Sequence, residues 1–177
     1  MLLTGPSESV GPPSSPVARD AKSVEAERDL YTAIDRQDAA KVERAVEGLT
    51  SSDESLRLAA LRYLATVKAT EHTQALLGLF DDPSERLRPA ALQLVGRFPG
   101  AETEAKLVEV SLDAARPLSE RSLALAALSD REASDPRTLT RSLLPGLLDA
   151  SQALREQIVG VLTHVTGQTA DVATTSD

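Results

Sequence analysis

The sequence predicts an all-α protein, built as a solenoid of about four helical hairpins behind one leading helix. Three observations support this fold class. Leu and Ala must form the core, because aromatic residues make up only 2% of the 177 residues and Trp is absent. Two short phrases recur along the chain at the same offsets. Apolar residues within these phrases follow the spacing of one helix face.

The first phrase carries a leucine–alanine pattern and recurs at offsets of 31, 36 and 31 residues. Its copies are "LRLAAL" (56–61), "LRPAAL" (87–92), "LALAAL" (123–128) and a weaker copy that starts at Leu154. The second phrase begins with apolar residues and precedes each copy of the first. Its copies are "AVEGLTS" (45–51), "LLGLFDD" (76–82), "LVEVSLD" (107–113) and "LLPGLLD" (143–149). Two phrases that share their offsets indicate an internal repeat.

Each repeat is expected to form a pair of helices. Leu56, Ala59, Ala60 and Tyr63 follow i, i+3, i+4, i+7 spacing, which places them on one face. We expect a leading helix at 22–36 and first helices at 38–49, 70–80, 101–113 and 137–149. The second helices are expected at 53–67, 84–97, 118–130 and 151–165. Pro89 then lies inside the second of these. Because one hairpin cannot bury its apolar stripe alone, neighbouring hairpins must stack.

The ends of the chain differ in composition from the repeats. Residues 1–20 are rich in Pro, Ser and Gly, so we expect a disordered tail or linker there, and a second polar tail at 169–177. The solenoid is therefore expected at 21–168. A linker of this kind can also tether a domain to a preceding anchor. No apolar run approaches the length of a membrane span.

An Asp closes the first helix of a repeat and an Arg follows six residues later, as in Asp82 with Arg88 and Asp149 with Arg155. Through these residues the repeats resemble the short form of the HEAT repeat that is common in bacteria. In HEAT arrays such residues form a ladder of hydrogen-bonded charges between repeats. The resemblance extends this ladder to Arg57 and Asp113, although Ser51 and Ala124 occupy their partners' frames. It also implies a right-handed solenoid whose second helices line a concave face.

Several classes of function are disfavoured by composition. A net charge of −8 leaves no basic footprint for nucleic acid. Cysteine is absent, and the two histidines, His72 and His164, lie in different repeats, so we expect no metal site, no cofactor and no catalytic group. We therefore expect a protein that is not an enzyme.

Three polar residues of the second helices are the candidate contacts. Arg62 and Gln93 share one repeat position, and Arg97 lies one turn beyond Gln93. Arginines on a concave face can hold an acidic peptide through bidentate contacts to carboxylates. The leading hypothesis is a monomeric, cytoplasmic scaffold that binds another protein or peptide. Two alternatives remain: a HEAT-like enzyme or enzyme accessory, similar to bilin lyases or DNA glycosylases, and a structural module of an anchored or periplasmic assembly.

Overall fold

The computed structural model describes residues 19–36, 38–148 and 151–174, with side chains as far as Gly167. Within these ranges all the regular structure is helical. The α-helices are α1 (Ala21–Arg36), α2 (Val42–Gly48), α3 (Glu54–Thr66), α4 (Thr73–Leu77), α5 (Leu87–Val95), α6 (Ala101–Leu112), α7 (Leu118–Ser129), α8 (Pro136–Leu143) and α9 (Gln152–Thr174). Short 3₁₀ helices extend the first helices of three hairpins: η1 (Ala39–Lys41), η2 (Thr70–His72), η3 (Gly78–Asp81) and η4 (Leu144–Leu148).

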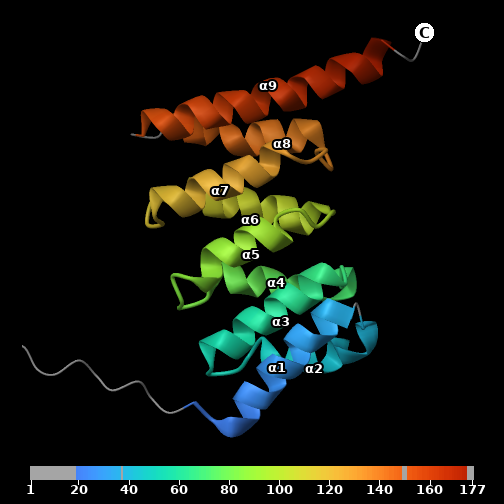
Figure 1. Ribbon diagram of the computed structural model, residues 1–177. Coiled ribbons are helices and arrows are strands. Elements are labelled where there is room, and N and C mark those ends of the chain that lie inside the picture. The colour runs from blue at the N-terminus through green and yellow to red at the C-terminus, as the bar shows by residue number, and fades with distance from the viewer. Residues whose placement is uncertain (1–18, 37, 149–150, 175–177) are drawn as a thin grey trace, which may run out of the picture.

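The helices stack as an α-solenoid, which confirms the expected fold (Figure 1). Four hairpins pair α2 with α3, α4 with α5, α6 with α7, and α8 with α9. The second helices α3, α5, α7 and α9 contact one another in sequence and form one layer, while α4, α6 and α8 form the other. The leading helix α1 packs against α3. It therefore stands where the second helix of a preceding repeat would lie.

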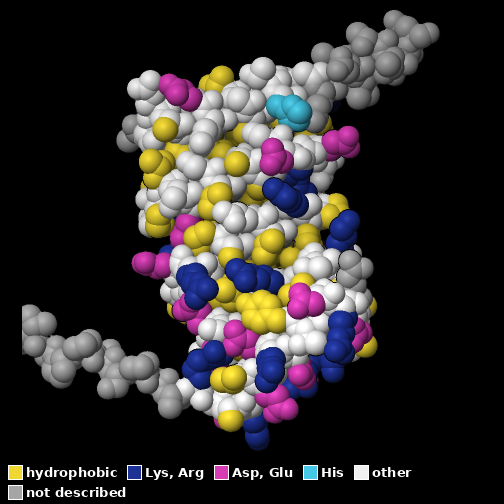
Figure 2. Space-filling model, viewed as in Figure 1, with side chains coloured by type: hydrophobic (Ala, Val, Ile, Leu, Met, Phe, Trp, Pro, Cys, Tyr) yellow, Lys and Arg dark blue, Asp and Glu magenta, His cyan; other side chains and the backbone are white. Residues whose placement is uncertain are grey.

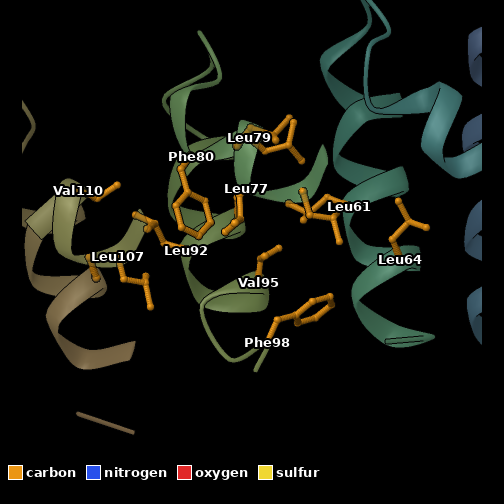
Figure 3. Packing of buried hydrophobic residues seen from close by; sticks show 14 of the residues in the cluster. Leu61, Leu64, Leu77, Leu79, Phe80, Leu92, Val95, Phe98, Leu107 and Val110 are labelled. Carbon is orange, nitrogen blue, oxygen red and sulfur yellow. The ribbon is translucent and has the colours of Figure 1, made fainter. Parts of the chain in front are cut away.

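Leucine and alanine fill most of the space between the two layers, together with a few Val, Phe, Ile and Tyr side chains. Leu61, Leu92 and Leu107 are fully buried, and they belong to three successive hairpins (Figure 3). The buried ring of Tyr63 keeps its hydroxyl paired, because it donates to the carbonyl of Asp38 at 2.8 Å and accepts from the N–H of Lys41 at 3.0 Å. The core is therefore continuous along the stack and contains few polar groups.

The last two hairpins approach each other closely at one glycine. A Cβ atom on Gly146 would lie 2.5 Å from Ile158 Cδ1 and 2.6 Å from Leu112 Cδ2. Carbon atoms at that separation clash, since their optimal distance is about 3.5–4.0 Å. The absence of a side chain thus allows η4 to sit against both α6 and α9.

Three of the four first helices contain 3₁₀ turns that the sequence did not predict, whereas α6 closely matches the expected helix at 101–113. Most of the expected helix at 70–80 is 3₁₀ helix on either side of α4, and the last part of the expected helix at 137–149 is η4. The second helix expected at 84–97 begins only at Leu87, so Pro89 lies in the first turn of α5. Amide groups in a first turn have no partner within the helix, so the proline removes no hydrogen bond.

The structure describes only part of the two expected tails. Helix α9 continues through Gly167 to Thr174, so the expected end at residue 165 is wrong, and 169–174 belong to the helix. The expected linker at 1–20 lies outside the described residues, apart from Arg19 and Asp20. Among the described residues, none of the helices is both long enough and apolar enough to cross a bilayer.

Candidate functional site

Two sets of arginines occupy different surroundings in the stack. The side chains of the first set form a ladder of ion pairs between neighbouring hairpins. Arg57 on α3 donates from Nε and Nη2 to the two carboxylate oxygens of Asp82, at 2.9 and 3.0 Å. Its Nη1 also donates to the carbonyl of Ser51 at 2.8 Å. The Arg57 and Asp82 side chains are only 12% and 5% exposed. This bidentate pair therefore joins the first hairpin to the second in a nearly dry environment.

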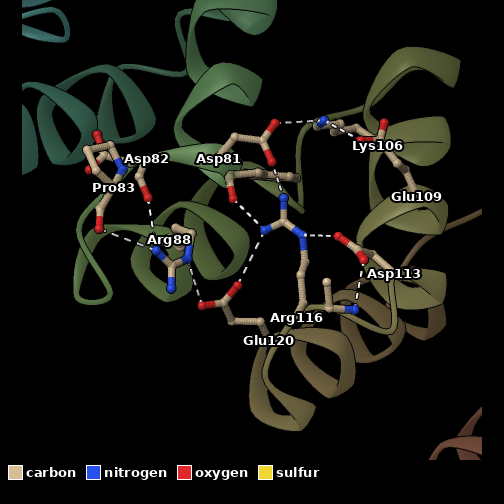
Figure 4. A network of polar contacts seen from close by, with 11 residues as sticks. Asp81, Asp82, Pro83, Arg88, Lys106, Glu109, Asp113, Arg116 and Glu120 are labelled. Carbon is tan, nitrogen blue, oxygen red and sulfur yellow. Dashed lines mark hydrogen bonds and ion pairs between the residues drawn. The ribbon is translucent and has the colours of Figure 1, made fainter.

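The arginine of the second hairpin contacts a different acid from the one predicted. Arg88 donates from Nε to Glu120 Oε1 at 2.8 Å and from Nη1 to the main-chain carbonyl of Asp82 at 3.0 Å (Figure 4). A side-chain pair between Arg88 and Asp82 is therefore wrong. The Asp82 carboxylate faces the preceding hairpin, where it binds Arg57, and it also accepts from the N–H of Ser84 at 2.8 Å.

The longer loop of the third hairpin changes which residues serve the ladder. The predicted acid Asp113 stays within its own loop, where it caps the N–H of Ala115 at 2.9 Å and lies 3.4 Å from Arg116. Glu120 takes its place as the partner of Arg88 and also lies 3.3 Å from Arg116. The buried Arg121 donates to the carbonyl of Ser111 at 2.9 Å. The repeat frame places Ala124, and not Arg121, at the position of the ladder arginine.

The ladder also has a rung at its N-terminal end. Arg19 donates to Asp53 at 2.7 Å and to Glu27 at 2.5 Å. Burial raises the pKa of Asp53, but bonds from Arg19 and from the N–H groups of Ser55 and Leu56 outweigh it and lower the pKa overall. Asp149, the predicted partner of Arg155, lies outside the described residues.

The second set of arginines lies along a groove between α3 and α5. The groove consists of two adjoining hollows of about 450 and 520 Å³. Thr66, Gln93 and Leu94 line both hollows, so they form one continuous surface, which we call the α3–α5 groove. The first hollow is completed by Tyr31, Ile34, Arg62 and Ala90. The second is completed by Ala65, Lys68, Thr70, Arg97, Phe98 and Pro99.

All three predicted contact residues are exposed in this groove. Arg62 comes from α3, Gln93 from α5, and Arg97 from the turn that follows α5. In Figure 2, hydrophobic side chains gather over α3 and α5, with Lys and Arg side chains beside them. Lys68, which the repeat frames do not predict, lies two residues past Thr66, the last residue of α3. Its φ of 54° is the left-handed conformation of many helix ends, and this turn brings it to the groove.

The groove is cationic, and no carboxylate of the described residues pairs with its cations. Arg62, Lys68 and Arg97 line it, whereas no Asp or Glu does. Within the described part of the chain, the three make no ion pair; Arg62 has only a long contact of 3.4 Å with the hydroxyl of Tyr31. This contrasts with the ladder arginines and with the net charge of −8.

A hollow between α4 and α6, in the other layer, shows the opposite arrangement. Its charges satisfy one another: Lys106 Nζ lies 2.8 Å from Asp81 and 2.7 Å from Glu109. Burial opposes the ionisation of both Asp81 and Lys106, but their mutual hydrogen bond and attraction prevail. They lower the pKa of Asp81 and raise the pKa of Lys106. This hollow therefore offers a ligand few free charges.

The α3–α5 groove is suited to binding and offers little for catalysis. It supplies guanidinium, ammonium and amide donors around an apolar surface, and no carboxylate or imidazole that could accept a proton. In the described ranges, no cluster of three or more His, Asp or Glu side chains is arranged to hold a metal ion. The chemistry available is recognition of an anionic, partly apolar ligand.

Comparison with known proteins agrees with the architecture. Residues 42–129 match the family model described as HEAT repeats. The matched segment begins at α2 and ends with α7, so it covers the first three hairpins and the whole length of α3 and α5. No curated protein matches the chain.

Proposed function

Because this chain is a HEAT-repeat protein, and HEAT repeats typically bind other proteins as non-catalytic scaffolds, we propose that it binds an acidic protein or peptide in the α3–α5 groove. Arg62, Gln93 and Arg97 are the contacts proposed from the sequence, and Lys68 joins them.

The observation that carries this proposal is a contrast between two sets of cations. The ladder arginines pair with carboxylates of the protein, whereas the groove cations pair with none among the described residues. Ladder arginines such as Arg57 already bind carboxylates of the protein itself, so they have little left to offer a partner. Arg62, Lys68 and Arg97 have no such carboxylate among the described residues, and they are exposed. A guanidinium group binds a carboxylate in a bidentate manner, so an acidic partner would gain directed hydrogen bonds as well as attraction.

The apolar part of the groove adds a second reason for a peptide-like partner. Leu94 is 36% exposed, and Ile34, Ala65 and Ala90 lie around it. Contact with an apolar side chain would remove this surface from water, which contributes roughly 25 cal/mol for each Å² buried. A small inorganic anion would not use this surface, whereas a peptide with acidic and apolar residues would.

Charge reversal tests the proposal. The variant Arg62→Glu with Arg97→Glu should lose partners that the parent captures, measured by quantitative mass spectrometry of captured proteins. Its melting temperature should stay close to the parent's, because both side chains are exposed. The matched control is Arg137→Glu with Arg141→Glu, which makes the same charge change on exposed residues of α8.

The comparison of the two variants decides the outcome. Loss of acidic partners by the groove variant alone supports the proposed surface. Equal capture by the parent and both variants would show that the groove is not the binding surface. Equal loss in both variants would show that overall charge, and not the groove, governs capture.

A further inference from the structure

The cations of the α3–α5 groove lie at its two ends. Arg62 belongs to the first hollow, beside Tyr31, while Lys68 and Arg97 belong to the second. The residues that the hollows share, Thr66, Gln93 and Leu94, lie between them. The groove therefore has a positive end, a middle with an exposed leucine and an amide, and a second positive end.

The separation of the two ends can be approximated from the helix that runs along the groove. Arg62 lies four residues before Thr66, the last residue of α3, which corresponds to a rise of about 6 Å, and Lys68 lies two residues further on, in the turn that follows the helix. The long side chains of arginine and lysine extend this reach at both ends. Two carboxylates about 9–13 Å apart can therefore be bound at the same time.

An extended peptide presents side chains at that spacing. Alternate residues of an extended chain point to the same side, and four steps span roughly 13 Å. A segment of the pattern acidic–x–apolar–x–acidic thus directs three side chains toward the groove. The two acids would meet the charged ends, and the apolar side chain would meet Leu94. The amide of Gln93 can both donate to and accept from the peptide main chain, which explains a neutral polar residue in the middle of a cationic groove.

We propose that the α3–α5 groove recognises a short extended segment in which two acidic residues flank one apolar residue, in the order acidic–x–apolar–x–acidic. This inference rests on the proposed function and specifies its ligand. Arg62 binds one acid, and Lys68 and Arg97 bind the other.

The probe is a fluorescein-labelled peptide with blocked ends, Ser-Gly-Glu-Ala-Leu-Ala-Glu-Gly-Ser, titrated with the full-length protein and followed by fluorescence anisotropy. A ligand of this size should bind with a dissociation constant between roughly 10 μM and 1 mM. Replacing either Glu by Gln, or Leu by Ser, should weaken binding roughly tenfold. Moving the Leu one position toward the first Glu keeps the composition but turns its side chain away, so this isomer should also bind more weakly.

Paired substitutions test which end binds which acid. Arg62→Gln should weaken the parent peptide but should have little further effect on the peptide that lacks the acid facing Arg62. It should still weaken the peptide that lacks the other acid. Arg97→Gln should show the reverse pattern. Arg141→Gln, at an exposed position of α8, is the control and should leave all the titrations unchanged.

The results separate this inference from the proposed function. Equal binding of the parent peptide and the isomer with the displaced Leu would overturn the pattern and leave only attraction between charges. No binding of the parent peptide at millimolar protein would overturn the pattern as well. In either case the capture experiment with Arg62→Glu and Arg97→Glu still decides whether the groove binds an acidic partner.

Discussion

The ladder rungs should differ in what they contribute to stability, and the difference follows from the second partner of each acid. Arg57→Met removes the guanidinium but keeps much of the aliphatic stem. It leaves the carboxylate of Asp82, 5% exposed, with the N–H of Ser84 as its remaining hydrogen-bond donor among the contacts described above. An uncompensated buried charge costs about 3–5 kcal/mol, so Arg57→Met should lower the free energy of unfolding by that amount.

Two comparison variants give reference values for the loss of unfolding free energy. Arg88→Met leaves Glu120 with Arg116, 3.3 Å away, so its cost should be smaller, about 1–3 kcal/mol. Arg44→Met breaks a pair with Asp29 in which both side chains are more than 40% exposed, and it should cost less than about 0.5 kcal/mol. The predicted order of destabilisation is therefore Arg57→Met, then Arg88→Met, then Arg44→Met.

Urea unfolding followed by circular dichroism measures these differences, provided that the slope of the transition stays constant. Adding Asp82→Asn to Arg57→Met removes the stranded charge while keeping an acceptor for Ser84, so the double variant should recover part of the loss. If Arg57→Met is no more destabilising than Arg44→Met, the rung does not hold the first two hairpins together. Failure of Asp82→Asn to rescue would show that charge burial is not the cause.

Two further predictions concern the core and the dependence on pH. Leu92→Ala empties a fully buried position and should cost about 2–5 kcal/mol, whereas Leu148→Ala, 90% exposed, should cost less than about 0.5 kcal/mol; equal unfolding midpoints would refute the packing register. Because the pKa of Asp81 is lowered on folding, its contribution is present above its unfolded pKa and is lost as the pH falls below about 4. Because the pKa of Lys106 is raised, its contribution is present below its ordinary value of 10.5 and is lost at higher pH. Asp81→Asn should reduce both changes in urea titrations at pH 3, 7 and 11, and an unchanged pH profile would exclude this pair as their source.

The fold could be predicted because two phrases shared one set of offsets. The repeated leucines and alanines mark buried positions most closely in the first two copies, where Leu56, Ala60 and Leu61 are buried, as are their counterparts Leu87, Ala91 and Leu92. In the third copy Ala126 is exposed, and Ala124 and Leu125 enter the core instead. Helix ends were predicted less well. The "LLPG" stretch contains Pro145 and Gly146, and packing of Gly146 against Ile158 and Leu112 accompanies a 3₁₀ turn there. The sequence of a single repeat does not indicate contacts such as that of Gly146 with Leu112, because they form only when two hairpins stack.

The ladder partners could not be read from the sequence for a related reason. Repeat frames align residues within a hairpin, so they suggested Asp82 for Arg88. The stacking of hairpins decides instead that Asp82 faces Arg57 in the preceding unit. Glu120 was missed because the five extra residues of the third unit fall before it. The same holds for the groove. Arg62 and Gln93 follow from a shared repeat frame and Arg97 from its place one turn beyond Gln93, whereas Tyr31 and Lys68 come from the leading helix and a turn, which the frames do not describe.

The position within the repeat separates the arginines that hold the stack from those offered to a partner. Arg57 and Arg62 are five residues apart, which places them about 140° apart around α3. One therefore points to the next hairpin and the other to the groove. Arg88 and Gln93 have the same relation on α5. In the next two units the frame of Arg62 holds Ser129 and Gly160, neither of which is charged. Positive charge in this frame is thus confined to the first unit. An acidic partner should accordingly engage the first two hairpins and α1, while the later hairpins lengthen and stabilise the stack.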